Sequence, residues 1–567
     1  MHVVTNTVRR GDREYTAVLL RRSYREEGKV KKETLANLSH LPPETIELVR
    51  RSLRGERFLA AAEAFTVERS LPHGHAAAVL AMARRLELAR LLDRASSRQR
   101  QRALAMICQR VLEPGSKLAC TRQLAQSTLA EELGVEGADA DELYAALDWL
   151  GERQERIEGG LARRHLAQGE LVLYDVSSSY FEGRTCPLAR RGYSRDHRRG
   201  SLQIVYGLLC DREGRPIAVE VFEGSLHDDK TLPRQVEKLR RRFGLSKLVL
   251  CLDRGMVTQA NLEELRAEGI AWISALKAPQ VKRLARTRVV QPSLFDELDL
   301  AEVVSEEYPG ERLLVCRNPL VAEDRRRRRE DLLAATEREL HPIRARVEQG
   351  TLRGEAEIGL AVGAVANRYK VRKHFLFEIA DDRFAYRRNA ARIDEEAALD
   401  GIYVLRTSVS ATELTSPEVV RSYKQLAEVE RAFRTLKSVD LEIRPINHRR
   451  EQRVRAHVLL CMLAYYLEWH LRRAWAELTF EDEQPPLPTD PVAKAERSAE
   501  AARKARHKRT ASGQPCHSFP TLLRELALIV RTTNRITGTE ATFQKVATAN
   551  DVQRRALELV ALDPERL

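Results

Sequence analysis

The fold of this chain is decided by the stretch LVLYDVSSSYF, which runs from Leu171 to Phe181. Its mostly apolar residues predict a buried β-strand. After a basic loop, Arg190 to Arg199, two more strands are predicted at Ser201 to Cys210 and Ile217 to Phe222. The turn Asp211 to Pro216 joins these two strands. The sequence therefore predicts a meander of three strands.

Helices and strands alternate after this meander. Helical spacing from Thr231 to Phe243 precedes the apolar run KLVLCLD, Lys247 to Asp253, which is typical of a strand covered on both faces. A helix from Gln259 to Glu268 and a strand from Ala271 to Leu276 follow. Together with the meander, these elements predict an α/β sheet of mixed direction.

The sheet pattern stops at Ala278-Pro279 and resumes at GIYVLRT, Gly401 to Thr407. The intervening segment contains a helical stretch from Glu330 to Glu348 and a strand-like part from Ala364 to Ile379. Its arginine run, Arg325 to Arg329, is either a solvated face or a clamp for backbone phosphates. One sheet domain interrupted by an inserted domain is the simplest architecture.

The stretch SPEVVRSYKQLAEVERAFRTLKS, Ser416 to Ser438, predicts a single helix directly after the resumed sheet. Ser416 is expected as its N-cap, and Pro417 suits the first helical position. Helical spacing places one apolar face on Leu426, Val429, Phe433 and Leu436.

A second stripe of this helix consists of residues seven apart, Tyr423, Glu430 and Lys437. Glu430 therefore lies at the margin of the buried face. Three nearby cations could hold phosphates or could be ordinary solvated charges, namely Lys424, Arg431 and Arg434.

The regions before and after the sheet are predicted to be mostly helical. Near the N-terminus, a β-hairpin is expected around Tyr15 to Tyr24, and Ser116 to Leu129 is a candidate second helix of a helix-turn-helix. These basic helices either read DNA in a groove or form a packing domain with solvated charges. After the sheet, a long helix is predicted from Arg453 to Trp475, and a final helical module from Phe519 to Arg531.

Five regions result from these patterns. They are an N-terminal, mostly helical region that is a candidate for DNA binding (1–165), a first part of the sheet domain (166–278), an inserted domain (279–396), a second part of the sheet domain with the Glu430 helix (397–480), and a linker with a C-terminal helical region (481–567).

Composition favours a globular protein with a polyanionic partner. Of the 567 residues, 31% are charged and 5% are aromatic, and the formal net charge is +14. Such a basic balance favours nucleic acid as the partner, although a protein can be basic without binding it.

Several other classes of protein are disfavoured. The eight cysteines are scattered without a C-x-x-C, which argues against disulfides and zinc and fits a reducing cytoplasm. The N-terminus lacks an apolar signal region, and the most apolar run, Ala456 to Leu467, is too short to span a bilayer. The sequence also lacks the P-loop and H-E-x-x-H motifs.

Three carboxylates stand where a site for two metal ions needs them. Asp175 lies inside the first predicted strand, Asp253 ends the strand Lys247 to Asp253, and Glu430 lies on the later helix. A charge in a buried strand is costly unless it is paired or binds a cation. Three such groups can hold two divalent ions about 3.5–4 Å apart, and Mg²⁺ prefers oxygen ligands. Each aspartate alone could instead cap a strand or form a salt bridge.

Other polar residues allow two interpretations. Asp228 and Asp229 follow the third strand and are either rival ligands or, as we favour, solvated turn acids. His448 and His457 either touch DNA or have a hydrogen-bonded structural role.

The chain resembles the DDE transposases of bacterial insertion sequences, in the cut-and-paste branch with the motif Y-x2-R-x3-E-x6-K. That motif reads here as Tyr423, Leu426, Glu430 and Lys437, so leucine replaces the arginine. The resemblance extends to several other segments, namely YDVSSSYFEG around Asp175, FEGSLHDDKTL (222–232), LCLDRGMVT around Asp253, SYREEGKVKKETLANLS (23–39), EPGSKLA (113–119) and RPINHRREQRVRAHVLLCMLAYYLE (444–468).

This resemblance implies a ribonuclease-H-like catalytic core with an inserted domain. It implies that Asp175, Asp253 and Glu430 bind two Mg²⁺ ions, for which Mn²⁺ can substitute. Tyr423 and Lys437 would contact DNA, and Arg431 or Arg434 would supply the contact of the missing arginine.

The implied activity is cleavage of DNA at terminal inverted repeats and transfer of the 3′-OH ends into target DNA. The implied partners are those DNAs and, when two ends are paired, a second copy of the chain, in the bacterial cytoplasm at the nucleoid and without a membrane. Two alternatives stay open, a two-metal nuclease that performs no strand transfer and a non-catalytic DNA-binding regulator.

Overall fold

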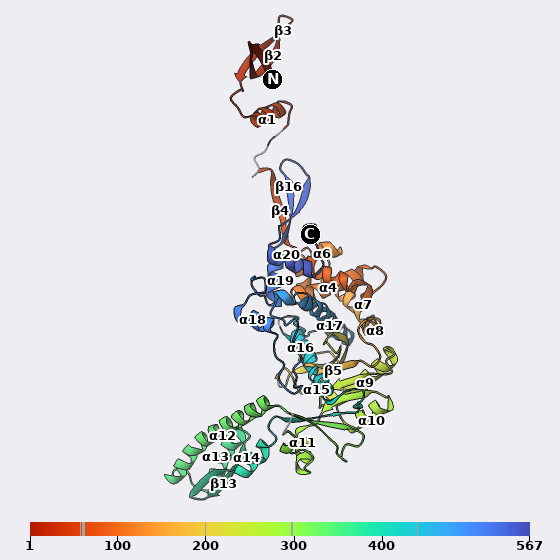
Figure 1. Ribbon diagram of the computed structural model, residues 1–567, viewed down its shortest axis with the longest axis vertical. Coiled ribbons are helices and arrows are strands. Elements are labelled where there is room, and N and C mark those ends of the chain that lie inside the picture. The colour runs from red at the N-terminus through yellow and green to blue at the C-terminus, as the bar shows by residue number, and fades with distance from the viewer. Residues whose placement is uncertain (57, 59–62, 199, 296–298, 439) are drawn as a thin grey trace. The chain divides into compact units, whose positions relative to one another are not determined.

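Figure 1 shows the computed structural model, which describes residues 1–56, 58, 63–198, 200–295, 299–438 and 440–567. The chain forms two units. The N-terminal unit comprises Met1–Ser70 and Arg531–Ala547, and the core unit comprises Leu71–Val530 and Thr548–Leu567.

The N-terminal unit consists mainly of strands. A meander of three antiparallel strands precedes helix α1, and a second three-stranded sheet has the order β17-β16-β4. The bounds are β1 (His2–Arg10), β2 (Arg13–Glu26), β3 (Lys29–Asn37), α1 (Pro43–Leu53), β4 (Phe65–Pro72), β16 (Val530–Ile536) and β17 (Thr542–Val546).

Two predictions for this region are wrong. The residues from Tyr15 to Tyr24, which were expected to form a hairpin, instead all lie within the single strand β2. The turns lie on either side of it, where Gly11, Glu27 and Gly28 have positive φ values of 59°, 51° and 80°. The first 72 residues are also not mostly helical, because strands rich in exposed charges lack the apolar alternation that would reveal them.

Helices dominate the core unit up to the central sheet, as predicted. The long helix α17 (Glu451–Ala474) packs against α2, α4 and α7 of this bundle. The bundle consists of α2 (Gly74–Arg85), α3 (Leu88–Leu92), α4 (Arg98–Leu112), α5 (Lys117–Leu124), α6 (Leu129–Leu133), α7 (Ala140–Gly151) and α8 (Gln154–His165). The candidate recognition helix is shorter than expected and buries Lys117, Cys120 and Leu124 in this bundle.

The central sheet is mixed, as predicted. Its strand order is β11-β12-β15-β10-β9-β5-β7-β6, with β8 paired to β7. Strand β9 runs parallel to both β5 and β10, and the remaining pairs are antiparallel. The bounds are β5 (Leu171–Tyr180), β6 (Arg190–Arg191), β7 (Leu202–Asp211), β8 (Pro216–Glu223), β9 (Val249–Leu252), β10 (Ala271–Ala275), β11 (Leu300–Val303), β12 (Arg312–Arg317) and β15 (Ile402–Thr407).

Helices from distant parts of the chain pack on this sheet. They include α16 against β5, α17 and α8 against β8, and α15 against β9 and β10. The remaining helices of the core unit are α9 (Leu232–Glu237), α10 (Gln259–Ala267), α11 (Ala278–Arg286), α18 (Ala499–His507), α19 (Phe519–Ala527) and α20 (Asp551–Leu559). No helix in the described part of the chain is long and apolar enough to cross a membrane.

The segment between β10 and β15 has two parts. Its strands β11 and β12 join the edge of the central sheet beside β15. The elements after β12 are α12 (Pro319–Glu348), α13 (Glu355–Arg368), β13 (Phe375–Ala380), β14 (Arg383–Arg388) and α14 (Ala390–Ala397). The first four pack around a small core that includes Leu340, Ile358, Val362 and Phe384. Helix α14 contacts a neighbouring cluster through Ile393. The strand-like part expected from Ala364 to Ile379 is helical as far as Arg368, so this prediction is wrong for its first residues. The reason is that Ile358, Val362 and Val365 have helical spacing and are buried in α13.

The helix predicted from Ser416 to Ser438 is two helices, α15 (Ser416–Lys424) and α16 (Leu426–Lys437), which meet at Gln425. The cap is Thr415 rather than Ser416, and the Glu418 carboxylate accepts bonds from the Thr415 backbone and hydroxyl at 2.8 and 2.7 Å. The predicted apolar face is confirmed, since Leu426, Val429, Phe433 and Leu436 are all buried.

Candidate active site

Two of the three predicted acids lie side by side on neighbouring strands. Asp175 is in the middle of β5, and Asp253 directly follows β9. The parallel register pairs Tyr174 with Leu252, so Asp175 and Asp253 each lie one residue beyond the same pair. Since adjacent strands are about 4.7–4.9 Å apart, the register brings both carboxylates to one end of the sheet.

Glu430 reaches the same place from the other side. Helix α16 packs against β5 through its apolar face, which leaves Glu430 exposed at the edge of the contact. A cavity of about 380 Å³ is lined by all three acids, Asp175, Asp253 and Glu430, and also by Asn318, Tyr403, Tyr423, Lys424, Leu426 and Ala427. The structure therefore brings the three predicted carboxylates together.

The environment of Asp175 disfavours the charged form of its carboxylate. Burial, then repulsion from Asp253 and Glu430, raise the pKa of Asp175 to about 7, against the opposing effects of the Val176 backbone N–H and Arg195. The Val176 N–H donates to Asp175 Oδ1 at 2.7 Å, and the Gly255 N–H donates to Asp253 Oδ2 at 3.3 Å.

Lys424 lines the same cavity as the three acids. Among the residues described by the structure, Asp175, Asp253 and Glu430 form no ion pair. Within that same part of the chain, no three His, Cys, Asp or Glu side chains are arranged closely enough to hold a metal ion. The acids thus share a cavity, and Asp253 and Glu430 repel the Asp175 carboxylate. Their side chains are not close enough together to surround a metal ion.

The four predicted DNA-contacting residues are in different environments. Tyr423 lines the cavity, and burial raises the pKa of its hydroxyl well above the usual range. Lys437 is instead largely buried and forms an ion pair with Asp196 at 3.1 Å. Arg431 pairs with Glu428 at 3.1 Å on the surface, and Arg434 is exposed. Neither arginine lines the cavity beside Leu426, the position of the missing arginine.

Two residues of the basic loop 190–199, Arg195 and Asp196, contact residues of the site although no sequence pattern singled them out. The Arg195 guanidinium acts on Asp175 electrostatically and binds the Asp228 carboxylate at 2.5 Å. Asp196 is buried and binds both Lys437 and Arg444, the latter at 2.6 Å. The only available signal was an acid within the cationic segment RRGYSRDHRRG, 190–200.

The residues with two interpretations are also placed by the structure. Asp228 is paired with Arg195 rather than solvated, and its carboxylate lies beside Gly255, close to that of Asp253. His457 is buried, with Nδ1 3.1 Å from Lys117 Nζ and Nε2 2.9 Å from the Ile443 carbonyl oxygen. His448 packs against Tyr144 and His457. Both histidines therefore have structural contacts.

Among the described residues, no cysteine lines the carboxylate cavity. All eight cysteines are free thiols. Cys251 lies two residues before Asp253. Burial raises the pKa of its thiol well above the usual range, so the thiol stays protonated.

Comparison with known proteins identifies the family. The family model described as the transposase DDE domain matches residues 168–467, and the model of the IS1634 family transposase N-terminal domain matches residues 3–64. No curated protein matches the chain significantly. A similar solved structure is the cryo-EM structure of the piggyBac transposase synaptic complex with hairpin DNA, with 9% identity, a TM-score of 0.33, and coverage of 80% of this chain and 76% of that chain. Because the DDE domain accounts for more than half of the sequence, the protein belongs to the DDE transposases of insertion sequences.

Proposed function

We propose that this transposase cuts DNA at the terminal inverted repeats of its insertion sequence and transfers the resulting 3′-OH ends into target DNA. In the first step, water attacks the scissile phosphorus and the 3′-oxygen leaves as a 3′-OH. In the second step, that 3′-OH attacks a phosphorus of the target and displaces a 3′-oxygen. The observation that carries the proposal is that Asp175, Asp253 and Glu430 line one cavity, and that none of the three forms an ion pair with another described residue.

The donor set suits divalent metal ions. Three carboxylates offer only anionic oxygen ligands, which Mg²⁺ and Mn²⁺ prefer, and their mutual repulsion would be relieved by a cation. When bound, such ions supply activation of the attacking hydroxyl and neutralisation of charge on the phosphate. Asp175, Asp253 and Glu430 would hold the ions, and their side chains would move closer together to do so.

Other residues of the site would orient the DNA. The Tyr423 hydroxyl keeps its proton at neutral pH because burial raises its pKa, so it can donate to a phosphate oxygen. Lys437, held by Asp196, would act on the DNA from the edge of the site together with Arg444. Arg431 and Arg434, which stay predicted DNA contacts, would bind the backbone farther along α16.

We also propose that the core is ribonuclease-H-like. The antiparallel meander β5-β7-β8, followed by β9 and β10 parallel to β5, supports this assignment. The boundaries 166–278 and 397–480 for its two parts, and 279–396 for the inserted domain, stay predictions. So do the pairing of two copies on the DNA ends and a location in the bacterial cytoplasm.

Cleavage of DNA that carries the element's own ends tests the proposal. Wild type is compared with Glu430→Gln in the presence of Mg²⁺, and Glu428→Gln is the matched control, since Glu428 lies on the same helix outside the cavity. We expect wild type and Glu428→Gln to nick at the ends, and Glu430→Gln to bind without cutting. Equal cutting by wild type and Glu430→Gln would mean that Glu430 is not part of the site.

Two further outcomes separate the alternative functions. Joined products with target DNA distinguish strand transfer from hydrolysis alone, and binding without any cutting by wild type would favour a regulator.

A further inference from the structure

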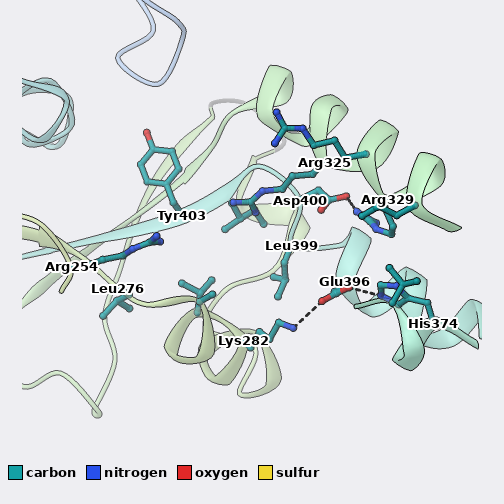
Figure 2. Close-up of a pocket in the computed structure, with 16 residues that line it drawn as sticks. Arg254, Leu276, Lys282, Arg325, Arg329, His374, Glu396, Leu399, Asp400 and Tyr403 are labelled. Atoms are coloured by element: carbon teal, nitrogen blue, oxygen red, sulfur yellow. Dashed lines mark hydrogen bonds and ion pairs between the residues drawn. The ribbon is translucent and has the colours of Figure 1, made fainter. Parts of the chain in front are cut away.

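A second cavity, of about 480 Å³, lies next to the carboxylate cavity. The two cavities share Tyr403 as a lining residue, and Arg254 of the second cavity directly follows Asp253 of the first. Figure 2 shows Arg254 on one side of this second cavity, and Arg325 and Arg329 of α12 on another. We call it the arginine cavity.

The arginine run 325–329 divides between two faces of α12. Arg326 pairs with Glu323 at 2.7 Å and Arg327 pairs with Asp324 at 2.9 Å, each one helical turn earlier. The other three arginines of the run line the cavity, namely Arg325, Arg328 and Arg329. Helical spacing explains the division, because positions three and four apart share a face.

The cavity carries excess positive charge. It is lined by five Arg or Lys side chains, and its two acids, Glu396 and Asp400, already have cationic partners. Figure 2 shows Asp400 paired with Arg329, and Glu396 paired with Lys282 at 3.3 Å and with His374. Glu396 also binds Lys373. In the described ranges of the chain, Arg254, Arg325 and Arg328 form no ion pair.

These three guanidinium groups are exposed and have no ion-pair partner among the described residues, and only Arg325 acts on an acid, Asp400, at longer range. They can therefore bind phosphate oxygens. A guanidinium binds a phosphate through two parallel hydrogen bonds, and the loss of hydration is smaller than for an ammonium. The wall below them is apolar and includes Leu276, Val281 and Leu332, which can contact deoxyribose. Arg254 directly follows Asp253, so the part of a DNA substrate that would reach the arginine cavity is the backbone next to the carboxylate cavity.

We propose that the arginine cavity binds the sugar-phosphate backbone next to the bond that is cut, with Arg254, Arg325 and Arg328 on successive phosphates. The inference rests on the proposed function, because it takes the scissile phosphate to lie at Asp175, Asp253 and Glu430. The inserted segment would thus hold the strand that leaves the carboxylate cavity past Tyr403.

Salt dependence of DNA binding tests this inference without catalysis. The triple variant Arg254→Ala/Arg325→Ala/Arg328→Ala is compared with Arg326→Ala/Arg327→Ala, which removes paired arginines from the outer face of the same run. Binding to duplex inverted-repeat ends is measured in EDTA over a range of salt concentrations. Loss of three phosphate contacts should reduce the slope of log K against log salt by about 2–3, since each contact contributes about 0.9. The control should keep the wild-type slope.

Methylphosphonate substitution locates the contacts. Neutralising single phosphates beside the cut site should weaken binding by wild type and leave the triple variant unaffected. An unchanged slope for the triple variant, an equal change in both variants, or sensitivity only to distant phosphates would overturn the inference.

Wild-type cleavage and its loss in Glu430→Gln are measured separately, so failure of the arginine cavity is distinguishable from failure of the proposed function. Circular dichroism checks that the triple variant is folded, which we expect because the three side chains are exposed.

Discussion

One residue of the proposed active site, Asp175, is placed at a cost to stability. Asp175 is half-buried beside Asp253 and Glu430, and its pKa is raised to about 7. A raised pKa means that the folded protein disfavours the charged carboxylate. At neutral pH and above, the folded protein without metal therefore holds an unfavourable charge, as is common where a site is organised for a ligand.

Replacing this charge should stabilise the protein and abolish its activity. We expect Asp175→Asn to unfold at higher urea concentration than wild type at pH 8 without metal. We also expect it to lose cleavage by about 100-fold or more, because it removes one of the proposed metal ligands. The gain should shrink as the pH falls from 8 to 5, because wild-type Asp175 then binds a proton in the folded state that the unfolded chain does not bind. A variant that is less stable than wild type at pH 8 would contradict this account.

Buried histidines should make the protein sensitive to acid. Burial, with Lys117, Arg453 and Arg110 nearby, lowers the pKa of His448 to about 3. Between that value and about 6.5, the unfolded chain binds a proton at this residue that the folded protein does not, so stability falls as the pH falls. We expect His448→Gln to reduce the difference in urea midpoint between pH 7.5 and 5. The exposed His341→Gln serves as control and should leave that difference unchanged.

At the scale of elements, the helix bundle holds the segment that follows α16. Arg110 of α4 donates to the carbonyl oxygens of Leu441 and Glu442, both at 3.3 Å. His457 of α17 contacts the Ile443 carbonyl oxygen and Lys117 of α5. This buried network fixes the backbone next to Arg444, which binds the same Asp196 as Lys437 of α16.

Breaking this network should loosen the segment. We expect Lys117→Met to destabilise the protein by about 1–3 kcal/mol, because it leaves the buried His457 Nδ1 without its partner. Burial lowers the pKa of Lys117 to about 7, so the neutral substitution adds little further cost. Urea denaturation measures the effect, and Arg122→Met, an exposed position on the same helix, should change stability by less than about 0.5 kcal/mol. Equal effects of the two substitutions would contradict the role of the network.

At the scale of the whole molecule, the proposed active site joins segments that are far apart in the chain. Asp175 comes from β5, Asp253 follows β9, and Glu430 lies on α16 after the inserted segment. A ligand that binds all three acids would connect the sheet to α16. Binding only to the folded state would then stabilise the core unit as a whole.

Metal ions should therefore raise the stability of the transposase. Above the dissociation constant, each tenfold increase in free Mg²⁺ or Mn²⁺ should add about 1.4 kcal/mol for one site, and excess EDTA should reverse the effect. Thermal denaturation with and without metal measures it. Glu430→Gln should show a smaller increase, and Glu428→Gln should respond like wild type. Identical responses in wild type and Glu430→Gln would mean that the ions bind elsewhere.

The sequence by itself determined the features that are written locally. Apolar runs predicted β5, β9, β10 and β15, and helical spacing predicted the buried face of α16. The positions of Asp175, Asp253 and Glu430 followed from those elements, because a strand or helix fixes the direction of its side chains within a few residues.

Only the tertiary structure decided which charges are paired and where strands without apolar alternation lie. Lys437 and Asp196 are 241 residues apart, so no local pattern could reveal their ion pair. The five arginines 325–329 look alike in sequence, yet contacts with Asp400, Glu323 and Asp324 separate them into paired and unpaired groups. The charged strands β1, β2 and β3 and the break at Gln425 were missed for the same reason. Local propensity is weak there, and contacts between distant segments outweigh it.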